Sequence, residues 1–209
     1  MRKLLASLAI TMGAVGAVHA QTNYQADADP AAGQEMAQVC AACHGQQGIS
    51  AVGTFPNLAG QQMSYLAKQV MDIRDGVRVV PQMAGIVDDY SDQDAWDVAA
   101  HFSRQNASLG QADADNAELL ARGEALYRAG DMAKGIPACS ACHTPTGAGI
   151  GSAVYPALSG QNVAYTVSTL QAFATGDRNN SPNNIMGDIA AKMSDSDMEA
   201  VANYVLGLH

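Results

Sequence analysis

The chain has 209 residues, with 11 basic and 20 acidic side chains and a formal charge of −9. An acidic surface argues against nucleic acid or anionic lipid as a partner, because both need a positive footprint on the protein, and it favours a basic protein partner. Hydrophobic residues make up 48% of the chain, an ordinary share for a globular protein. The length suits one large or two small domains.

Residues 1–20 resemble a secretory signal peptide. Arg2 and Lys3 precede an apolar run over residues 4–18, and Val18-His19-Ala20 offers small residues at the cleavage positions. The alternative is an uncleaved anchor, because about 15 apolar residues is short for a membrane span but not impossible. We expect cleavage after Ala20, export to the periplasm and, with nine basic and 20 acidic residues left, a formal charge of −11. No other stretch is apolar enough to span a bilayer.

The remaining pattern predicts three main helices in each half of the chain and almost no strand. In the first half they run from Asp29-Pro30 towards residue 39, over residues 61–75, and from Ser91 onwards; in the second, over 116–129, over 161–174, and from Ser194 onwards. An Asp N-cap before Pro, glycine after the middle helices and Ser-x-x-Asp at the last helices are typical helix boundaries. The prediction is an all-α protein.

Cys-x-x-Cys-His occurs twice, and the two sites use all four cysteines. They are Cys40, Cys43 and His44 in the first half, and Cys139, Cys142 and His143 in the second. This is the spacing of c-type haem attachment. Two thiols one helical turn apart can form thioethers with the vinyl groups of a haem, while the adjoining imidazole reaches the iron. The sequence therefore predicts two covalently bound haem c groups, each with an axial histidine.

Two other uses of these cysteines are open to an exported chain. The four thiols could form two disulfides, or the pairs could bind zinc. Neither use requires histidine immediately after both pairs, so the duplicated histidine favours haem.

The sequence also repeats with a period of about 100 residues. The first cysteines are offset by 99 positions, the FPNLAGQ segment at 55–61 returns as YPALSGQ at 155–161, and SDQD at 91–94 returns as SDSD at 194–197. This pattern indicates a tandem duplication of one domain of roughly 90 residues. We expect an N-terminal domain over residues 21–110 and a C-terminal domain over 111–209, each wrapped around one haem, which serves as a nucleus for a small apolar core.

Methionine is the obvious sixth ligand for iron in an electron-transfer site. Met83 lies eight residues before Ser91, and Met186 lies eight residues before Ser194, so the repeat places these two methionines at the same position. We expect them to be the distal ligands; the alternative is ordinary packing. The methionines that have no such counterpart are expected to fill core space: Met63, Met193 and Met198.

Other polar residues near the repeated elements have candidate supporting roles. Pro56 and Pro156 could supply the carbonyl that accepts a hydrogen bond from the second imidazole nitrogen, or they could form plain rigid turns. Arg74 and Arg178 could pair with haem propionates, or they could be solvated surface arginines. We assign none of the remaining histidines to iron: His19, His101 and His209.

Together these motifs resemble the dihaem cytochrome c4 family of bacterial class I c-type cytochromes, over the whole chain after residue 20. The resemblance includes both haem sites, both Pro-x-Leu-x-Gly-Gln elements, both methionines and the longer loop at 128–137. It implies two tandem cytochrome c domains related by a pseudo-twofold axis, with haem edges facing across the interface. It also implies the ligand pairs His44 with Met83, and His143 with Met186.

The resemblance further implies a periplasmic carrier of single electrons in a respiratory chain. The implied donor is a quinol-oxidising cytochrome bc complex, and the implied acceptor is a terminal haem-copper oxidase. His101 departs from the family, where tyrosine is usual, so packing near the first haem is expected to differ. The segments before the two methionines, VVPQ at 79–82 and SPNNI at 181–185, also differ, so we expect different potentials.

Two other functional classes remain as alternatives. A dihaem electron-transfer subunit of a larger dehydrogenase, such as a flavocytochrome, would carry the same motifs. A dihaem peroxidase would need an open position on one iron, whereas both irons here have a methionine candidate, so we do not expect an enzyme. The charge is uneven: residues 21–115 carry −8 and residues 116–209 carry −3. We therefore expect the N-terminal domain to steer basic partners more strongly.

Overall fold

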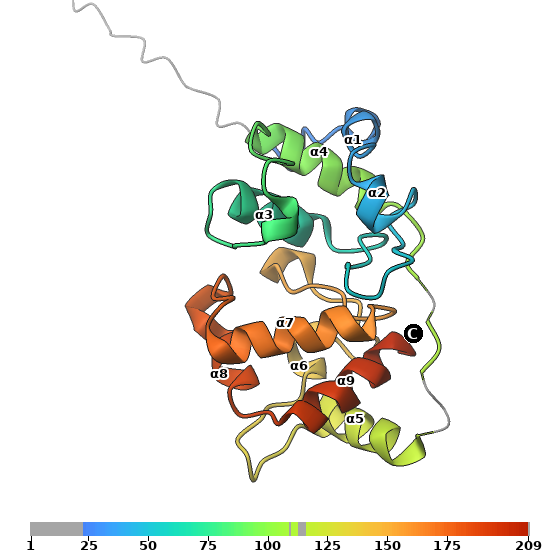
Figure 1. Ribbon diagram of the computed structural model, residues 1–209, viewed down its shortest axis with the longest axis vertical. Coiled ribbons are helices and arrows are strands. Elements are labelled where there is room, and N and C mark those ends of the chain that lie inside the picture. Colours follow the sequence, from blue (N-terminus) through green and yellow to red (C-terminus); the bar gives the residue numbers. More distant parts are fainter. Residues whose placement is uncertain (1–22, 109, 113–115, 209) are drawn as a thin grey trace, which may run out of the picture.

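The computed structural model describes residues 23–108, 110–112 and 116–208, so the signal peptide predicted at 1–20 lies outside the described residues. Figure 1 shows two helical domains stacked along the long axis, the first in blue to green and the second in yellow to red. The described residues form helices and two isolated bridges, Asp131 with Ile136 and Ile150 with Tyr155, and no strand. The all-α prediction is confirmed.

Each domain has three main helices and a short helix at its Cys-x-x-Cys-His motif. In the N-terminal domain the elements are α1 (Pro30–Met36), α2 (Ala41–His44), α3 (Met63–Arg74), the 3-10 helix η1 (Pro81–Met83) and α4 (Asp92–Ser103). In the C-terminal domain they are α5 (Ala117–Ala129), α6 (Ser140–His143), η2 (Gly151–Ala153), α7 (Val163–Thr175), η3 (Pro182–Asn184), α8 (Ile185–Ala190) and α9 (Asp195–Leu206). The six main helices match the prediction within a few residues at each boundary that was predicted.

The helix starts follow from their capping side chains. Asp29 accepts a hydrogen bond from the Ala31 N–H at 2.8 Å, and Pro30 occupies the first helical position. Ser91 and Ser194 each form a complete capping box with the aspartate three residues later. These local bonds satisfy N–H groups that have no partner inside the helix, so the boundaries are set by local sequence.

The first and last helices of each domain cross with their backbones in contact. A Cβ atom on Gly33 of α1 would lie 2.0 Å from the Asp97 carbonyl oxygen of α4, and one on Gly123 of α5 would lie 2.1 Å from the Ala200 carbonyl oxygen of α9. Only glycine fits at both crossings. The first and last helices therefore pack against each other in the same way in both domains.

Each domain has its own apolar core between these helices. Leu66, Val98 and Phe102 are central in the first core, and Met63 packs against it. The second core contains buried Met198, and Met193 packs against it, so all three methionines expected to fill core space do so. Among the described residues, no helix combines the length and the hydropathy needed to cross a membrane.

The repeated Pro-x-Leu-x-Gly-Gln elements meet at the domain interface. Gln61 accepts a hydrogen bond from the Ala157 N–H at 2.7 Å and donates one to the Ala157 carbonyl at 2.9 Å. Ser64, at the start of α3, donates to the Gly151 carbonyl at 2.6 Å, and the Tyr165 N–H of α7 donates to the Gly53 carbonyl at 3.0 Å. The two domains are therefore joined through residues that the repeat places near the haem motifs.

Candidate haem-binding sites

Both Cys-x-x-Cys-His motifs form a single helical turn. The His44 N–H donates to the Cys40 carbonyl at 2.9 Å, and the His143 N–H donates to the Cys139 carbonyl at the same distance. None of the four cysteines takes part in a disulfide in the structure, which argues against the disulfide alternative. Among the described residues, no three or more histidine, cysteine, aspartate or glutamate side chains come together to hold a metal ion, so the structure gives no support to the zinc alternative.

Each motif histidine is buried and held by a proline carbonyl. Nδ1 of His44 lies 2.9 Å from the Pro56 oxygen, and Nδ1 of His143 lies 2.9 Å from the Pro156 oxygen. Because a carbonyl can only accept, Nδ1 carries the proton in both rings and the lone pair of Nε2 is free for a metal. Burial lowers the pKa of both imidazoles, so both are neutral at neutral pH. The predicted carbonyl role of the two prolines is confirmed.

The loop after the first motif links the haem site to the interface. Ser50 donates its hydroxyl to the Cys43 carbonyl at 2.7 Å, and its N–H donates to Asn57 Oδ1 at 2.9 Å. Asn57 Nδ2 in turn donates to the Gly160 carbonyl of the other domain at 2.9 Å. The repeat does not predict this chain of bonds, because Ala157 stands at the position of Asn57 and the bonds exist in one half only.

The two candidate distal methionines are presented by different local structures. Met83 is the last residue of η1, whereas Met186 is the second residue of α8 and packs against the second core. Asn183 and Asn184 reach α8 through left-handed backbone, with φ of 52° and 56°, a conformation that asparagine tolerates better than most residues. The different sequences before the two methionines therefore fold into different local structures. Their role as iron ligands stays a prediction.

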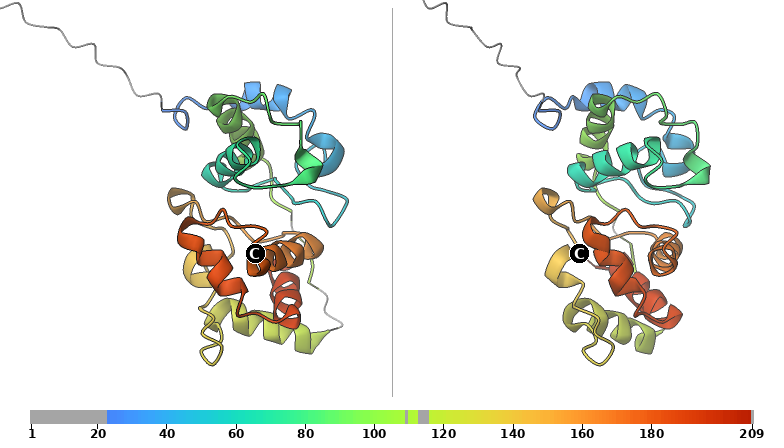
Figure 2. Two further views of the ribbon diagram at one scale, coloured as in Figure 1. Left: turned by 60° about the vertical axis from the view of Figure 1, so that its left-hand side comes forward. Right: turned by 90° about the vertical axis from the view of Figure 1, so that its left-hand side faces the viewer.

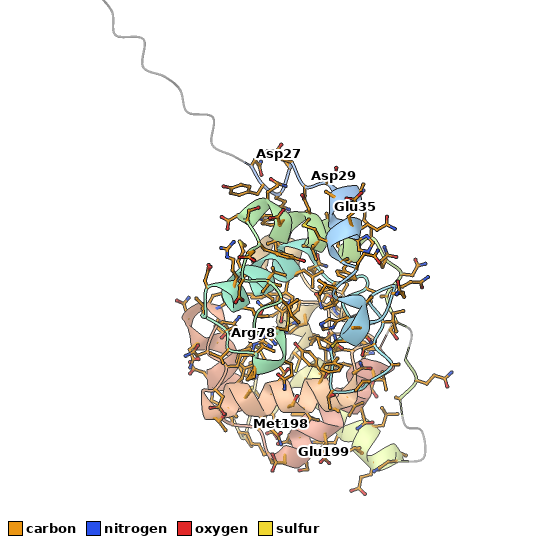
Figure 3. The ribbon with its side chains drawn as sticks, turned by 45° about the horizontal axis from the view of Figure 1, so that its top comes forward. Asp27, Asp29, Glu35, Arg78, Met198 and Glu199 are labelled. Atoms are coloured by element: carbon orange, nitrogen blue, oxygen red, sulfur yellow. The ribbon has the colours of Figure 1, made fainter. Side chains whose placement is uncertain are left out.

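Two arginines cross the interface in a reciprocal manner. Arg178 of the C-terminal domain donates to the Tyr65 hydroxyl at 2.8 Å and to Gln69 Oε1 at 2.9 Å. Arg78 of the N-terminal domain donates to the same Gln69 oxygen at 2.9 Å and to the Tyr165 hydroxyl at 3.3 Å. Figure 3 shows Arg78 between the two domains. The 100-residue offset relates the two arginines to each other.

The surroundings of these two arginines show whether the interface suits the propionate groups of a haem. Arg178 is 6% exposed, and within the part of the chain that the structure describes neither Arg178 nor Arg78 has a carboxylate in ion-pair contact. A buried cation needs a counter-charge. Haem propionates would supply it, and the two histidines and four cysteines would hold the macrocycle, so the residues fit the cofactor.

Arg74 does not share this role. It contacts Asp75 at 2.7 Å and Asp92 at 2.9 Å, and it donates to the Tyr90 carbonyl at 2.9 Å. These partners place Arg74 at the surface of the N-terminal domain, which fits the surface alternative. The interface position belongs to Arg78, and the repeat offset that relates it to Arg178 was the signal that could have identified it.

His101 also agrees with the prediction that it is an ordinary imidazole. It lies in the last turn of α4, with its ring centroid 5.0 Å from that of Phe102. His19 and His209 lie outside the described residues.

The comparisons with known proteins agree with this geometry. Residues 28–102 match the family model described as cytochrome c oxidase, cbb3-type, subunit III, and residues 120–209 match the model described as cytochrome c. Cytochrome c4 of Pseudomonas aeruginosa is 47% identical over 210 residues, covering 100% of both chains. The chain belongs to the cytochrome c4 family.

Members of the cytochrome c4 family are dihaem electron carriers. A solved structure of a family member also resembles this chain. The crystal structure of reduced recombinant cytochrome c4 from Pseudomonas stutzeri matches with a TM-score of 0.83 and 44% identity, covering 87% of this chain and 100% of that one. A thiosulfate dehydrogenase electron acceptor of Stutzerimonas stutzeri is 38% identical over 206 residues, covering 96% of this chain and 90% of the relative.

The fold and cofactor of the chain follow from this membership. It has two tandem cytochrome c domains related by a pseudo-twofold axis, and it carries two covalent haem c groups. One is attached at the motif of Cys40, Cys43 and His44, and the other at the motif of Cys139, Cys142 and His143.

Proposed function

We propose that the protein is a periplasmic electron carrier that passes single electrons from a quinol-oxidising cytochrome bc complex to a terminal haem-copper oxidase. The observation that carries this proposal is the duplicated site. Each half brings a buried neutral histidine with a free Nε2 and a methionine at the repeated position, Met83 or Met186. Two six-coordinate irons exchange electrons and leave no position for substrate, so the chain is a carrier and not an enzyme.

Export through residues 1–20 supports the periplasmic location. Haem attachment to thiols takes place outside the cytoplasm, and the signal-like segment ends at Ala20. N-terminal sequencing of the protein isolated from the periplasm should begin at Gln21. An intact residue 1–20 segment in a membrane fraction would instead identify an anchored carrier.

Carbon monoxide titration of the fully reduced holoprotein tests the carrier function. Carbon monoxide binds reduced haem iron only where the sixth position is open or readily vacated. An unchanged absorption spectrum is the expected result, because both irons keep a methionine ligand. Binding at one haem would make that iron a candidate catalytic or sensing site and would overturn one methionine assignment.

A specific observation favours a second donor, namely a dehydrogenase. The Stutzerimonas stutzeri relative is named as a thiosulfate dehydrogenase electron acceptor. Like the dehydrogenase-subunit alternative, such a protein takes its electrons from a dehydrogenase. Reduction rates of the oxidised protein by a cytochrome bc complex and by a thiosulfate dehydrogenase, measured at equal enzyme concentrations, separate the two donors. Faster reduction by the bc complex supports the respiratory role, and faster reduction by the dehydrogenase supports the alternative.

A further inference from the structure

Exposed apolar side chains are concentrated in one of the two domains. Among the described residues, five of the six exposed large hydrophobic side chains lie in the N-terminal domain: Val39, Ile49, Val52, Val77 and Val79, with Met132 alone in the other domain. The domains share one framework, so this asymmetry does not come from the fold.

Three of these valines shortly precede residues of the first haem site in the chain. Val39 immediately precedes Cys40 and is 51% exposed, whereas Val77 and Val79, 54% and 74% exposed, precede Met83. Figure 2 shows the short helices that follow them, α2 and η1, on the same side of the N-terminal domain in both views. Val39, Val77 and Val79 are called the apolar rim below.

The C-terminal domain lacks this rim at the equivalent positions. The repeat offsets pair Val39 with Ala138, Val77 with Asp177 and Val79 with Asn179, so a small or polar residue replaces each valine. Burying exposed valine is favourable in an interface, whereas burying an aspartate or asparagine without a partner is costly. Only the first haem site therefore has an apolar contact surface beside it.

The N-terminal domain that carries the apolar rim has an acidic net charge. Asp75 is paired with Arg74, whereas Asp88 and Asp89 are exposed and have no lysine or arginine in ion-pair contact among the described residues. At the positions of Asp88 and Asp89 the second domain has Ala191 and Lys192. The formal charge is −8 on residues 21–115 and −3 on residues 116–209, so the N-terminal domain is the more acidic of the two. A basic surface would thus be attracted to the N-terminal domain and held beside the apolar rim.

We propose that the apolar rim is the docking face for a redox protein whose own contact face has an apolar centre surrounded by lysine and arginine. The proposal rests on the electron-carrier function and assigns the contact to the N-terminal domain. Three exposed valines on a domain with an acidic net charge suit a small, transient contact: long-range charge attraction brings the partner in, and apolar contact orients it for electron transfer.

Electron-transfer rates of rim variants test the docking face. The reduced holoprotein is mixed with an oxidised lysine-rich mono-haem cytochrome c in a stopped-flow instrument, and the second-order rate constant is measured. The V77S/V79S variant should react roughly fivefold to tenfold more slowly, because two valine side chains no longer contribute apolar contact area. V39S tests the other segment of the rim and should also react more slowly.

Two matched controls lie in the other domain. M132S removes a more exposed apolar side chain, at 89% exposure, and N179S changes the repeat counterpart of Val79. Both should keep the wild-type rate. A small cation, hexaammineruthenium(II), should reduce the oxidised form of all variants at the wild-type rate, because it needs no apolar contact. Wild-type rates in the rim variants, or an equal loss in the controls, would overturn the docking face.

Amide chemical shifts give a second readout that does not depend on electron transfer. Titrating the ¹⁵N-labelled holoprotein with the same lysine-rich cytochrome c should shift amides at 38–40 and 77–80. Shifts confined to the C-terminal domain would overturn the proposal while leaving the carrier function intact. Failure of the oxidised wild-type protein to accept electrons from hexaammineruthenium(II) would instead count against the carrier function, so the two failures are distinguishable.

Discussion

Gln161 holds Asn57 at both of its backbone polar groups across the domain interface. Its Oε1 accepts from the Asn57 N–H at 2.8 Å, and its Nε2 donates to the Asn57 carbonyl at 3.0 Å. Gln61 holds Ala157 in the same way from the other domain. The repeated glutamine thus makes two hydrogen bonds across the interface from each domain. The two pairs of bonds are equivalent under the pseudo-twofold axis that relates the domains.

Replacing Gln161 with alanine should weaken the coupling of the domains. The buried N–H and carbonyl of Asn57 would lose their partners, at a cost of about 2 kcal/mol in the free energy of unfolding. Guanidinium unfolding of the holoprotein, followed by circular dichroism, measures this loss. Q171A is the control, because Gln171 is an exposed amide bonded to Asp195 at 3.1 Å, and it should cost much less. Equal losses in both variants would contradict an interface role for Gln161.

Replacing either candidate distal methionine should open one iron. M83A or M186A should lose the near-infrared methionine-to-iron absorption of one haem and should bind carbon monoxide at that haem when reduced. The control is M198L, since Met198 is a buried core residue and a volume-conserving substitution leaves ligation unchanged. If M186A remains fully six-coordinate with an unchanged potential, another residue is the distal ligand of the second haem.

Removing the interface guanidinium should lower a haem potential. A haem gains one negative charge on reduction, and Arg178 is a buried cation without a carboxylate in ion-pair contact among the described residues. It therefore favours the reduced state, and R178Q should lower at least one midpoint potential by roughly tens of millivolts. Spectroelectrochemical titration measures the shift. R128Q, which removes an exposed cation paired with Glu124, should leave both potentials close to wild type.

Asp197 should make stability depend on acid pH. Burial disfavours its charged form, yet hydrogen bonds from Lys134 at 2.5 Å, the Ser194 N–H at 3.0 Å and Arg122 at 2.7 Å hold its pKa well below the ordinary value. A carboxylate with a depressed pKa stabilises the fold above its unfolded pKa of about 3.9 and loses this effect as the pH falls below it.

The variant D197N isolates this effect. It should be less stable than wild type by about 2 kcal/mol at pH 7, and its stability should fall less between about pH 5 and pH 2. D94N is the matched control: Asp94 forms the same capping box in the other domain, and no lysine or arginine of the described part pairs with it. Parallel pH curves for wild type and D197N would contradict the assignment.

Local sequence was sufficient for the helices and for the haem motifs. Capping residues such as Asp29, Ser91 and Ser194 act within one turn, so their effect is visible without the fold. The contacts of His44 with Pro56 and of His143 with Pro156 were also predictable, because both partners belong to repeated elements. The short helices η1 and α8 could not be predicted, since they have only three and six residues and neither has a side-chain hydrogen bond at its N-cap.

The arginines show what the sequence left open. Arg74 and Arg178 both stand near the glycine that ends a middle helix, so the sequence offered both of them the same two alternatives, a propionate partner or a surface arginine. The structure separates them, because Arg74 has carboxylate partners at the surface while Arg78 crosses to Tyr165. Which cation is buried depends on packing between the domains, and residues 87 or more positions apart in the chain decide it.

The chain alone was enough to identify two haem attachment sites, a duplicated all-α domain and the cytochrome c4 family, because these depend on residues a few positions apart or at a constant offset. Only the tertiary structure decided that Gln161 holds Asn57, that Arg78 and Arg178 exchange partners, and that exposed valines adjoin one haem site only. These features depend on burial, and burial is a property of the folded domains together.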